Sequence, residues 1–199
     1  MSKLRVLTII SITLPILVMA GTIDLSPIAD TYTVPEGGCY GHTTELWVAT
    51  YSPADHFERT MIKFDLSPFM GQSIDSAVLH LYRFFGCPMG GVTNTDFYHA
   101  TQDWDEDWDG GHVNHGDIIW ANTKYDDNGW WETDITELVQ AWLNSEYTNY
   151  GLVKHAKSGS KLSKFNSREA SSNKPYLTLT GSGVAVETQS MGLIKALFR

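Results

Sequence analysis

The chain has 199 residues, and its 23 acidic residues outnumber its 14 Lys and Arg, which gives a net charge of −9 with neutral histidines. Such an acidic surplus repels phosphate backbones, so nucleic acid is excluded as a partner. The length suits one domain with a core of its own.

The first residues have the layout of a secretory signal peptide. Lys3 and Arg5 form a short basic region, and the next 15 residues, Val6 to Ala20, carry no charge. The run is shorter than the ~20 apolar residues of a membrane-spanning helix, and Pro15 interrupts it. We therefore expect residues 1–20 to be a cleaved signal peptide and the protein to be secreted, extracellular or at the cell surface. An uncleaved anchor is the alternative. Cleavage leaves no other candidate membrane span and a charge of 12 − 23 = −11.

Two cysteines, Cys39 and Cys87, are the only ones in the chain. An even number in an exported protein predicts a Cys39–Cys87 disulfide, which would stabilise the fold by about 2–4 kcal/mol. A pair of free thiols is the alternative, because the sequence does not give the distance between the two Cα atoms.

Short runs of alternating apolar and polar residues dominate the body of the chain. They are rich in β-branched and aromatic residues and end at Gly, Pro, Ser, Asn or Asp, as β-strands do. The expected strands are Glu45–Tyr51, Glu58–Leu66, Ile74–Phe85, Thr95–Ala100, Tyr150–Ala156 and Tyr176–Thr180. In the second strand, Ile62 and Phe64 share one face and Met61 lies on the other, which predicts a half-buried strand.

The strand at Ile74–Phe85 has one apolar face and one mixed face. Leu79 and Leu81 belong to the first, whereas His80 and Tyr82 belong to the second. A mixed aromatic face is typical of a strand that lines a groove, so Tyr82 is a candidate ligand-binding residue. A central strand covered on both sides is the alternative.

One segment departs from the β pattern. Asp134-Ile-Thr-Glu137 has the spacing of a capping box, and apolar residues follow at helical intervals as far as Leu143. We expect one short α-helix of about ten residues here, with Trp142 in the core. Gly181-Ser-Gly183 then predicts a linker, so residues 182–199 are expected to be a linker and C-terminal tail. The tail is either loosely docked or a sorting signal.

Several blocks of the sequence, taken in order, resemble a known family. They are Ala29-Asp-Thr-Tyr32, Ile62-Lys-Phe-Asp-Leu-Ser67, Ile74–Tyr82, Asp134–Trp142, Asn149-Tyr-Gly-Leu152, Ser167-Arg-Glu169 and Pro175-Tyr-Leu177. Over residues 24–181 the chain resembles the DNRLRE domain, a disaggregatase-related module classed as carbohydrate-binding module family ninety-six. With the strand pattern, the resemblance implies an all-β jelly-roll β-sandwich with one short α-helix. It also implies a surface or secreted protein that binds polysaccharide, with alginate-type acidic glycans as the best-known case.

The family pattern usually contains a short Trp-x-Glu and a later Trp. Trp104-Asp-Glu106 and Trp120 fit it, whereas the Asp-, Gly- and His-rich loop between them is enlarged. We expect this departure to bear on specificity. No ligand-binding residue is carried over from the family.

The enlarged loop holds the densest cluster of acids in the chain, and carboxylate oxygens are the ligands that Ca²⁺ prefers. The candidate calcium ligands are Asp103, Asp105, Asp107 and Asp109. Their spacing is not that of an EF-hand, and a solvated acidic loop is the alternative. His112 and His115 with a carboxylate are a weaker candidate for zinc.

A basic stretch follows in this acidic protein, and such a concentration of cations suits the carboxylates of an acidic glycan. The candidate ligand-binding lysines are Lys154, Lys157, Lys161 and Lys164. A solvated hairpin whose edge lysines prevent aggregation is the alternative. Arg168 and Glu169 are expected to form an internal ion pair.

Sugar rings stack on exposed indoles, and Trp108, inside the acidic loop, is the tryptophan that we expect to face solvent. The adjacent Trp130 and Trp131 should point to opposite faces of a strand. The chain lacks Gly-x-Ser-x-Gly, His-Glu-x-x-His and a phosphate loop. We therefore expect a non-catalytic module that binds a polysaccharide or cell-surface glycan, with calcium as its one candidate cofactor. A structural or adhesive surface protein that self-associates is the alternative, and a lyase or hydrolase is a third reading.

Overall fold

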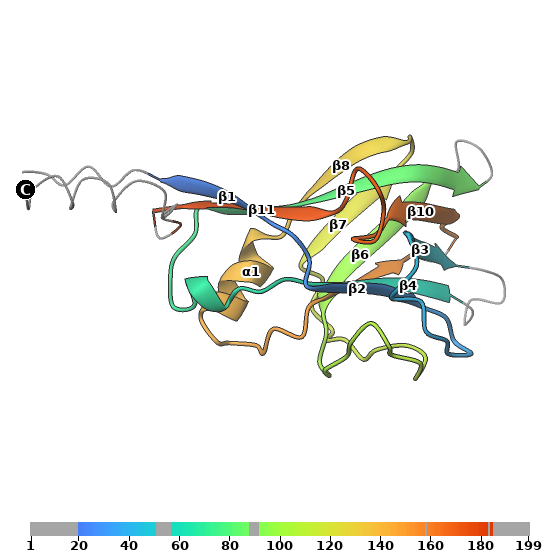
Figure 1. The fold of residues 1–199 in the computed structure, drawn as a ribbon, viewed down its shortest axis with the longest axis horizontal. Coiled ribbons are helices and arrows are strands. Elements are labelled where there is room, and N and C mark those ends of the chain that lie inside the picture. The colour runs from blue at the N-terminus through green and yellow to red at the C-terminus, as the bar shows by residue number, and fades with distance from the viewer. Residues whose placement is uncertain (1–19, 51–56, 88–91, 158, 183, 185–199) are drawn as a thin grey trace, which may run out of the picture.

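A computed structural model describes residues 20–50, 57–87, 92–157, 159–182 and 184 (Figure 1). The described part consists of antiparallel β-strands, one α-helix and one 3₁₀ turn. In chain order the elements are β1 (Gly21–Leu25), β2 (Ala29–Thr33), β3 (Glu45–Thr50), β4 (Phe57–Lys63), η1 (Ser67–Phe69), β5 (Ser76–Cys87), β6 (Thr93–His99), β7 (Ala121–Tyr125), β8 (Gly129–Asp134), α1 (Thr136–Leu143), β9 (Leu152–Ala156), β10 (Leu162–Asn166) and β11 (Tyr176–Gly181).

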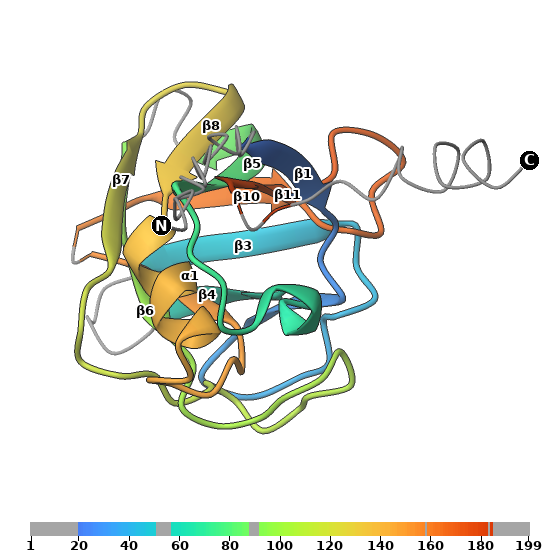
Figure 2. The same cartoon turned by 90° about the vertical axis from the view of Figure 1, so that its left-hand side faces the viewer.

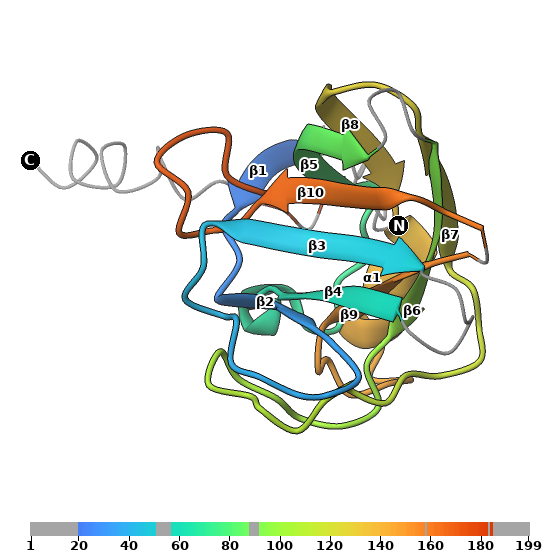
Figure 3. The same ribbon diagram turned by 90° about the vertical axis from the view of Figure 1, so that its right-hand side faces the viewer.

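The strands form one curled antiparallel sheet that folds over on itself into a sandwich (Figures 1 and 3). Hydrogen bonds connect them in the order β1-β11-β5-β10-β3-β4-β9-β6-β7, while β8 pairs with β5 and β2 with β4. The long strand β5 pairs with β11 over Ser76–His80 and with β10 over Arg83–Cys87. This architecture confirms the expected all-β sandwich of jelly-roll type with one short helix.

The main core lies inside the curl, and α1 closes one end of it (Figure 2). Leu79 and Leu81 of β5 pack there with Trp142 of the helix, which is 2 % exposed, as expected. The N-cap of α1 is Ile135, without a side-chain cap hydrogen bond, so the expected capping box from Asp134 to Glu137 is not formed. The Asp134 carboxylate instead accepts a hydrogen bond from the Thr136 backbone N–H at 2.9 Å. The helix therefore ties the end of β8 to the core.

A second apolar cluster lies between the outer faces of β4 and β9 and the loop at residues 100–120, which crosses beneath them in Figure 1. Met61 and Val153 are buried there against Trp104. The Trp104 indole Nε1 donates to the carbonyl oxygen of Tyr150 at 2.7 Å and fixes the loop. The prediction of a half-buried β4 is therefore wrong at Met61, because the loop covers that face.

The six strands expected from alternation are all present, as β3, β4, β5, β6, β9 and β11. Cys39 is a free, exposed cysteine whose Sγ donates to the carbonyl oxygen of Glu106 at 3.3 Å, and the Cys87 side chain lies outside the described residues. The structure thus gives the Cys39–Cys87 disulfide no support. The expected signal peptide (residues 1–19) and most of the expected tail (residues 185–199) also lie outside the described residues. Among the described residues, no helix is long and apolar enough to span a bilayer.

Candidate functional site

A groove of about 260 Å³ opens on the outer face of β4, β9 and β6, next to the second apolar cluster. It is lined by Thr50, Phe57, Asp96, Tyr98, His155, Ala156 and Lys157. Asp96 of β6 faces His155 of β9 in the strand register, and Tyr98 faces Val153 of the apolar cluster. The groove therefore occupies the part of this sheet face that the 100–120 loop leaves open.

Stacked rings give the groove its aromatic character. Phe57 stacks on His112 with ring centroids 4.5 Å apart, and Tyr98 stacks on His115 at 4.2 Å. The His155 ring lies 4.6 Å from Phe57 and 6.5 Å from Tyr98. Burial, together with a nearby guanidinium, lowers the pKa of His155 to about 4, so this imidazole is neutral at pH 7.

The groove is lined by one carboxylate and one lysine, and a second cation, Arg59, lies beside it against Phe57. Lys157 Nζ lies 3.1 Å from Asp96 Oδ1, and the Lys157 side chain is 48 % exposed. Asn122 Nδ2 also donates to Asp96 Oδ1, at 2.8 Å. Arg59 packs over Phe57 with Cζ 4.5 Å from the ring centroid, and burial lowers the pKa of Arg59 to about 10, which keeps it protonated at pH 7. Two cations thus accompany one carboxylate.

A second exposed aromatic surface lies on the outer face of β8, β5 and β11. Trp130 is 45 % exposed and meets Tyr82 and Tyr176 edge-on, each with ring centroids 5.5 Å apart. The neighbouring acid is Glu132, whose Oε1 lies 3.6 Å from His80 Nδ1. Tyr82, predicted as a ligand-binding residue, belongs to this surface and is half-buried.

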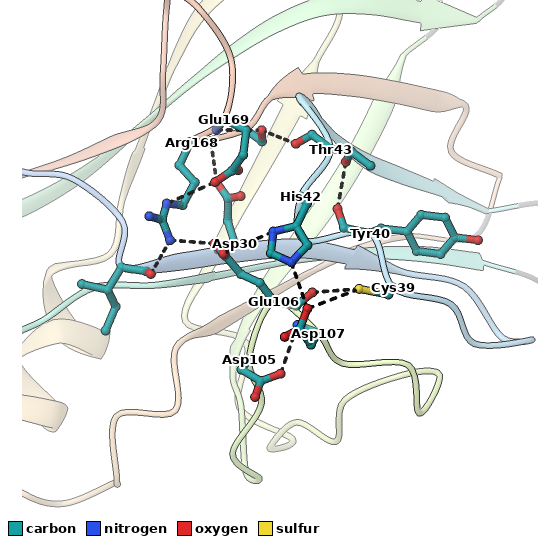
Figure 4. Close-up of polar contacts among 12 residues, drawn as sticks. Asp30, Cys39, Tyr40, His42, Thr43, Asp105, Glu106, Asp107, Arg168 and Glu169 are labelled. Carbon is teal, nitrogen blue, oxygen red and sulfur yellow. Dashed lines mark hydrogen bonds and ion pairs between the residues drawn. The ribbon is translucent and has the colours of Figure 1, made fainter.

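Three carboxylates from distant parts of the chain meet at the 100–120 loop (Figure 4). They belong to Asp30 of β2, Glu106 of the loop and Glu169 of the turn after β10, and one oxygen from each lies within 4.8 Å of the others. Arg168 Nη1 pairs with Glu106 Oε1 at 2.7 Å, and Arg168 Nε pairs with Glu169 Oε1 at 3.4 Å. We call these four residues the acidic cluster.

Asp30 is the buried centre of the acidic cluster. It is 0 % exposed, and its Oδ2 accepts the backbone N–H of Arg168 at 2.8 Å. Burial raises the pKa of Asp30 to about 8, and the charges of Glu169 and Glu106 add to the increase. Asp30 therefore holds a proton at neutral pH and shares a side-chain hydrogen bond with Glu169.

A model of carbohydrate-binding module family 96 matches residues 21–181. The chain belongs to this family. No curated protein matches it. Family 96 membership makes the chain a carbohydrate-binding module, as the resemblance predicted, whereas the DNRLRE name stays a prediction.

Two of the blocks that carry the resemblance to family 96 meet in the acidic cluster with the Trp-x-Glu motif of the family pattern. Asp30 belongs to Ala29–Tyr32, Glu106 to the Trp-x-Glu motif, and Glu169 to Ser167-Arg-Glu169. The expected Arg168–Glu169 ion pair is confirmed. The sequence alone did not show that Asp30 and Glu106 lie beside this ion pair, because 76 residues separate Asp30 from Glu106 in the chain.

The four predicted calcium ligands do not converge, and of them only Asp107 belongs to a group with metal-compatible spacing among the described residues. Asp103 pairs with Lys63 Nζ at 2.7 Å, and Asp107 pairs with His42 Nε2 at 2.9 Å. Asp105 accepts the Asp107 backbone N–H at 3.1 Å, and Asp109 is exposed. Each acid has its own surroundings because the loop turns between them. His112 and His115 instead stack on groove rings.

The four predicted lysines do not form one patch, because side chains alternate along β9 and β10. Lys154 is 0 % exposed and points into the core, so it is not available to a glycan. Lys164 lies on the opposite layer, with Nζ 3.8 Å from the Trp47 ring centroid and 3.0 Å from Glu45 Oε2. Lys157 lines the groove, and Lys161 is exposed in the nearby β9–β10 connection.

Trp108 is not the solvent-facing tryptophan that we expected. It packs against the second apolar cluster, and its indole Nε1 donates to the carbonyl oxygen of Gly111 at 2.8 Å. Trp130 is exposed and Trp131 packs against the main core, which confirms their opposite orientations. The groove residue His155 was missed, although its position between Lys154 and Ala156 places it on the outer face of β9.

Proposed function

We propose that this family 96 member is an exported, non-catalytic module that binds an acidic polysaccharide in the groove on β4, β9 and β6. The family match over residues 21–181 carries the proposal. The uncharged run that follows Lys3 and Arg5 supports export to the cell surface or medium. The groove supports the choice of ligand and the absence of catalysis.

The groove combines the two kinds of contact that a sugar requires. The Tyr98 and Phe57 rings supply apolar surface, and Asp96 and Lys157 supply a hydrogen-bond acceptor and a donor. Ligand sites in proteins typically combine aromatic walls with a few placed polar groups. A sugar ring fits this description because it has apolar C–H faces and polar edges.

The charge of the groove favours an acidic sugar. Lys157 and Arg59 outnumber Asp96, and Asp96 is already paired with Lys157 and Asn122. Lys161 adds an exposed cation in the nearby β9–β10 connection. In a protein with a net charge of −9, such a local positive excess attracts carboxylates selectively.

The acids of the groove argue against hydrolysis. A glycosidase uses two carboxylates about 5–10 Å apart. Among the described residues that line the groove, Asp96 is the one carboxylate, and it is held by an ion pair and an amide. The groove is therefore suited to hold a glycan and not to cleave it.

The test is calorimetric titration with alginate, pectin and a neutral glucan, at low and high salt. We expect binding to the two acidic glycans that weakens with salt, because exposed charges are screened. Lys157→Ala should lower the affinity about three- to tenfold. Lys124→Ala removes a lysine that is also exposed (59 %) and is paired with Asp126 at 4.0 Å outside the groove, so it should leave the affinity unchanged.

Three results would contradict the proposal. Binding to the neutral glucan that is abolished by Trp130→Ala would move the site to the exposed aromatic surface. Release of new chain ends from alginate would show catalysis. No affinity for any glycan, together with concentration-dependent self-association, would favour a structural or adhesive protein.

A further inference from the structure

Trp130 lies at the centre of the exposed aromatic surface, which has no part in the groove. The indole is 45 % exposed, and Tyr82 of β5 and Tyr176 of β11 each meet it edge-on with ring centroids 5.5 Å apart. Edge-on contact is a favourable geometry for aromatic pairs, so the two tyrosines hold the indole in place. An indole that is both fixed and exposed offers a stacking surface to a ring with apolar C–H faces.

A chain of polar contacts crosses the same face of the sheet, from β8 to β1. Glu132 Oε1 lies 3.6 Å from His80 Nδ1, and His80 Nε2 lies 3.1 Å from Thr178 Oγ1. The Thr178 hydroxyl donates in turn to Asp24 Oδ1 at 2.6 Å. The His80 ring also stacks on Tyr176 with centroids 4.2 Å apart. Polar and aromatic side chains thus fix one another, so the surface is ordered before any ligand arrives.

The charge of this face is negative. Asp24 of β1, and Glu132 and Asp134 of β8, are exposed, and the strand register places all three on the same side of the sheet. Arg83 is the one basic residue in the sequences of β1, β5, β8 and β11, and it is 1 % exposed. The groove has the opposite excess of charge. The two surfaces therefore favour ligands of opposite charge.

Family 96 membership gives the class of the ligand, a carbohydrate, and the charge of the face gives its chemistry. An acidic sugar is repelled by the three carboxylates. Glu132 lies two residues from Trp130 along β8, which is about 7 Å on the same face of a strand. A sugar ring stacked on the indole therefore brings a substituent within reach of the Glu132 carboxylate. A protonated amine is the substituent that both the carboxylate and the indole face attract.

We propose that the exposed aromatic surface is a second glycan site, which binds a polysaccharide of protonated amino sugars through Trp130 and Glu132. The site is separate from the groove, because β5 and β8 lie in the upper part of Figure 3 and β4 and β9 in the lower part. The proposal rests on family membership and not on the acidic ligand of the groove. A module with both sites links an acidic polysaccharide to a cationic one.

The test is calorimetric titration of the full chain with a glucosamine hexamer at pH 6, and with the N-acetylated hexamer, which keeps the rings and lacks the charge. We expect the amine form to bind about tenfold more tightly or better, and its affinity to fall with salt. No binding of the amine form, or equal affinity for the two hexamers, would overturn the proposal. An oligolysine peptide that binds as tightly as the hexamer would assign the surface to a cationic protein segment instead.

Variants locate the site. Trp130→Ala removes the stacking surface and should weaken binding of the glucosamine hexamer about tenfold or more. Glu132→Gln keeps the shape of the side chain and removes its charge, so it should weaken binding about three- to tenfold, and it provides the test if Trp130→Ala does not fold. Asp109→Asn removes an exposed carboxylate from the 100–120 loop and should bind the hexamer as the wild type does.

Full affinity in both surface variants, or an equal loss in Asp109→Asn, would refute the assignment. None of these titrations contains an acidic glycan. A groove that fails to bind alginate therefore leaves their outcome unchanged, and the two proposals stand or fall separately.

Discussion

Lys154 is a buried lysine in the core of the sandwich, and its replacement by Met should stabilise the protein. The side chain is 0 % exposed, and Nζ has no hydrogen-bond partner among the described residues. Nζ lies 3.1 Å from the ring centroid of Phe165 and 4.2 Å from that of Tyr125. Two aromatic rings therefore occupy the position of the carboxylate that normally pairs with a buried lysine.

The magnitude follows from two opposing terms. A lysine buried without a carboxylate either keeps its ammonium ion, at a cost of several kcal/mol that a cation–π contact offsets by about 2 kcal/mol, or gives up a proton that it holds in the unfolded chain. Lys154→Met removes both, keeps an unbranched side chain, and places a thioether against the two rings. We expect the free energy of unfolding to increase by about 1–3 kcal/mol. The melting temperature should rise by about 2–4 °C for each kcal/mol.

The pH dependence gives the prediction a second signature. Burial, with a contribution from the charge of Arg83, lowers the pKa of Lys154 well below its ordinary value. Between that lowered pKa and about 10.4, the unfolded chain holds a proton that the folded chain has lost. Wild-type stability therefore rises with pH in this window, by up to about 1.4 kcal/mol per unit. Lys154→Met lacks this slope, so its advantage shrinks as the pH rises.

The assay is urea unfolding of wild type and Lys154→Met at pH 7 and pH 9.5. Lys161→Met, at an exposed position, is the control and should change the stability by less than about 0.5 kcal/mol. A Lys154→Met variant that is less stable than wild type, with the same pH slope, would refute the reasoning.

Three further predictions concern the groove and the loop. Because burial lowers the pKa of His155 to about 4, wild-type stability should fall as the pH drops from 6.5 towards 4, and His155→Gln should flatten this fall in thermal melts. Trp104→Phe removes the 2.7 Å hydrogen bond to the part-buried carbonyl group of Tyr150, so it should cost about 1 kcal/mol and speed proteolysis in the 100–120 loop; unchanged proteolysis would contradict this. Gly41→Ala should cost about 1–3 kcal/mol by displacing Glu106, and a melt equal to wild type would count against the close contact.

Alternation along strands was the part of the sequence that predicted structure best. It gave six strands and the opposite faces of Trp130 and Trp131, while helical spacing of apolar residues gave the burial of Trp142. The same rule also contained the answer for Lys154, since Leu152 and Ala156 share its face and both are buried. The charge of Lys154 led us to place it on the surface, and the pattern was the better guide.

The candidate sites depend on contacts between residues far apart in the chain, which the spacing of neighbouring residues does not predict. Asp103 to Asp109 alternate in the sequence, but Lys63 and His42, from distant segments, pair with two of them. The acidic cluster assembles across separations of 76 residues, from Asp30 to Glu106, and 169 − 106 = 63 residues, from Glu106 to Glu169. Such convergence is a product of the sheet topology, in which β2 and the turn after β10 lie beside one loop.

The most direct test of the central claim is a map of the glycan-binding surface by NMR, with alginate oligosaccharide titrated into isotope-labelled protein. We predict that the shifted resonances cluster at the groove, on Phe57, Asp96, Tyr98, His155 and Lys157, while those of Trp130 stay in place. Shifts centred on Trp130, or no shifts at saturating oligosaccharide, would contradict the account.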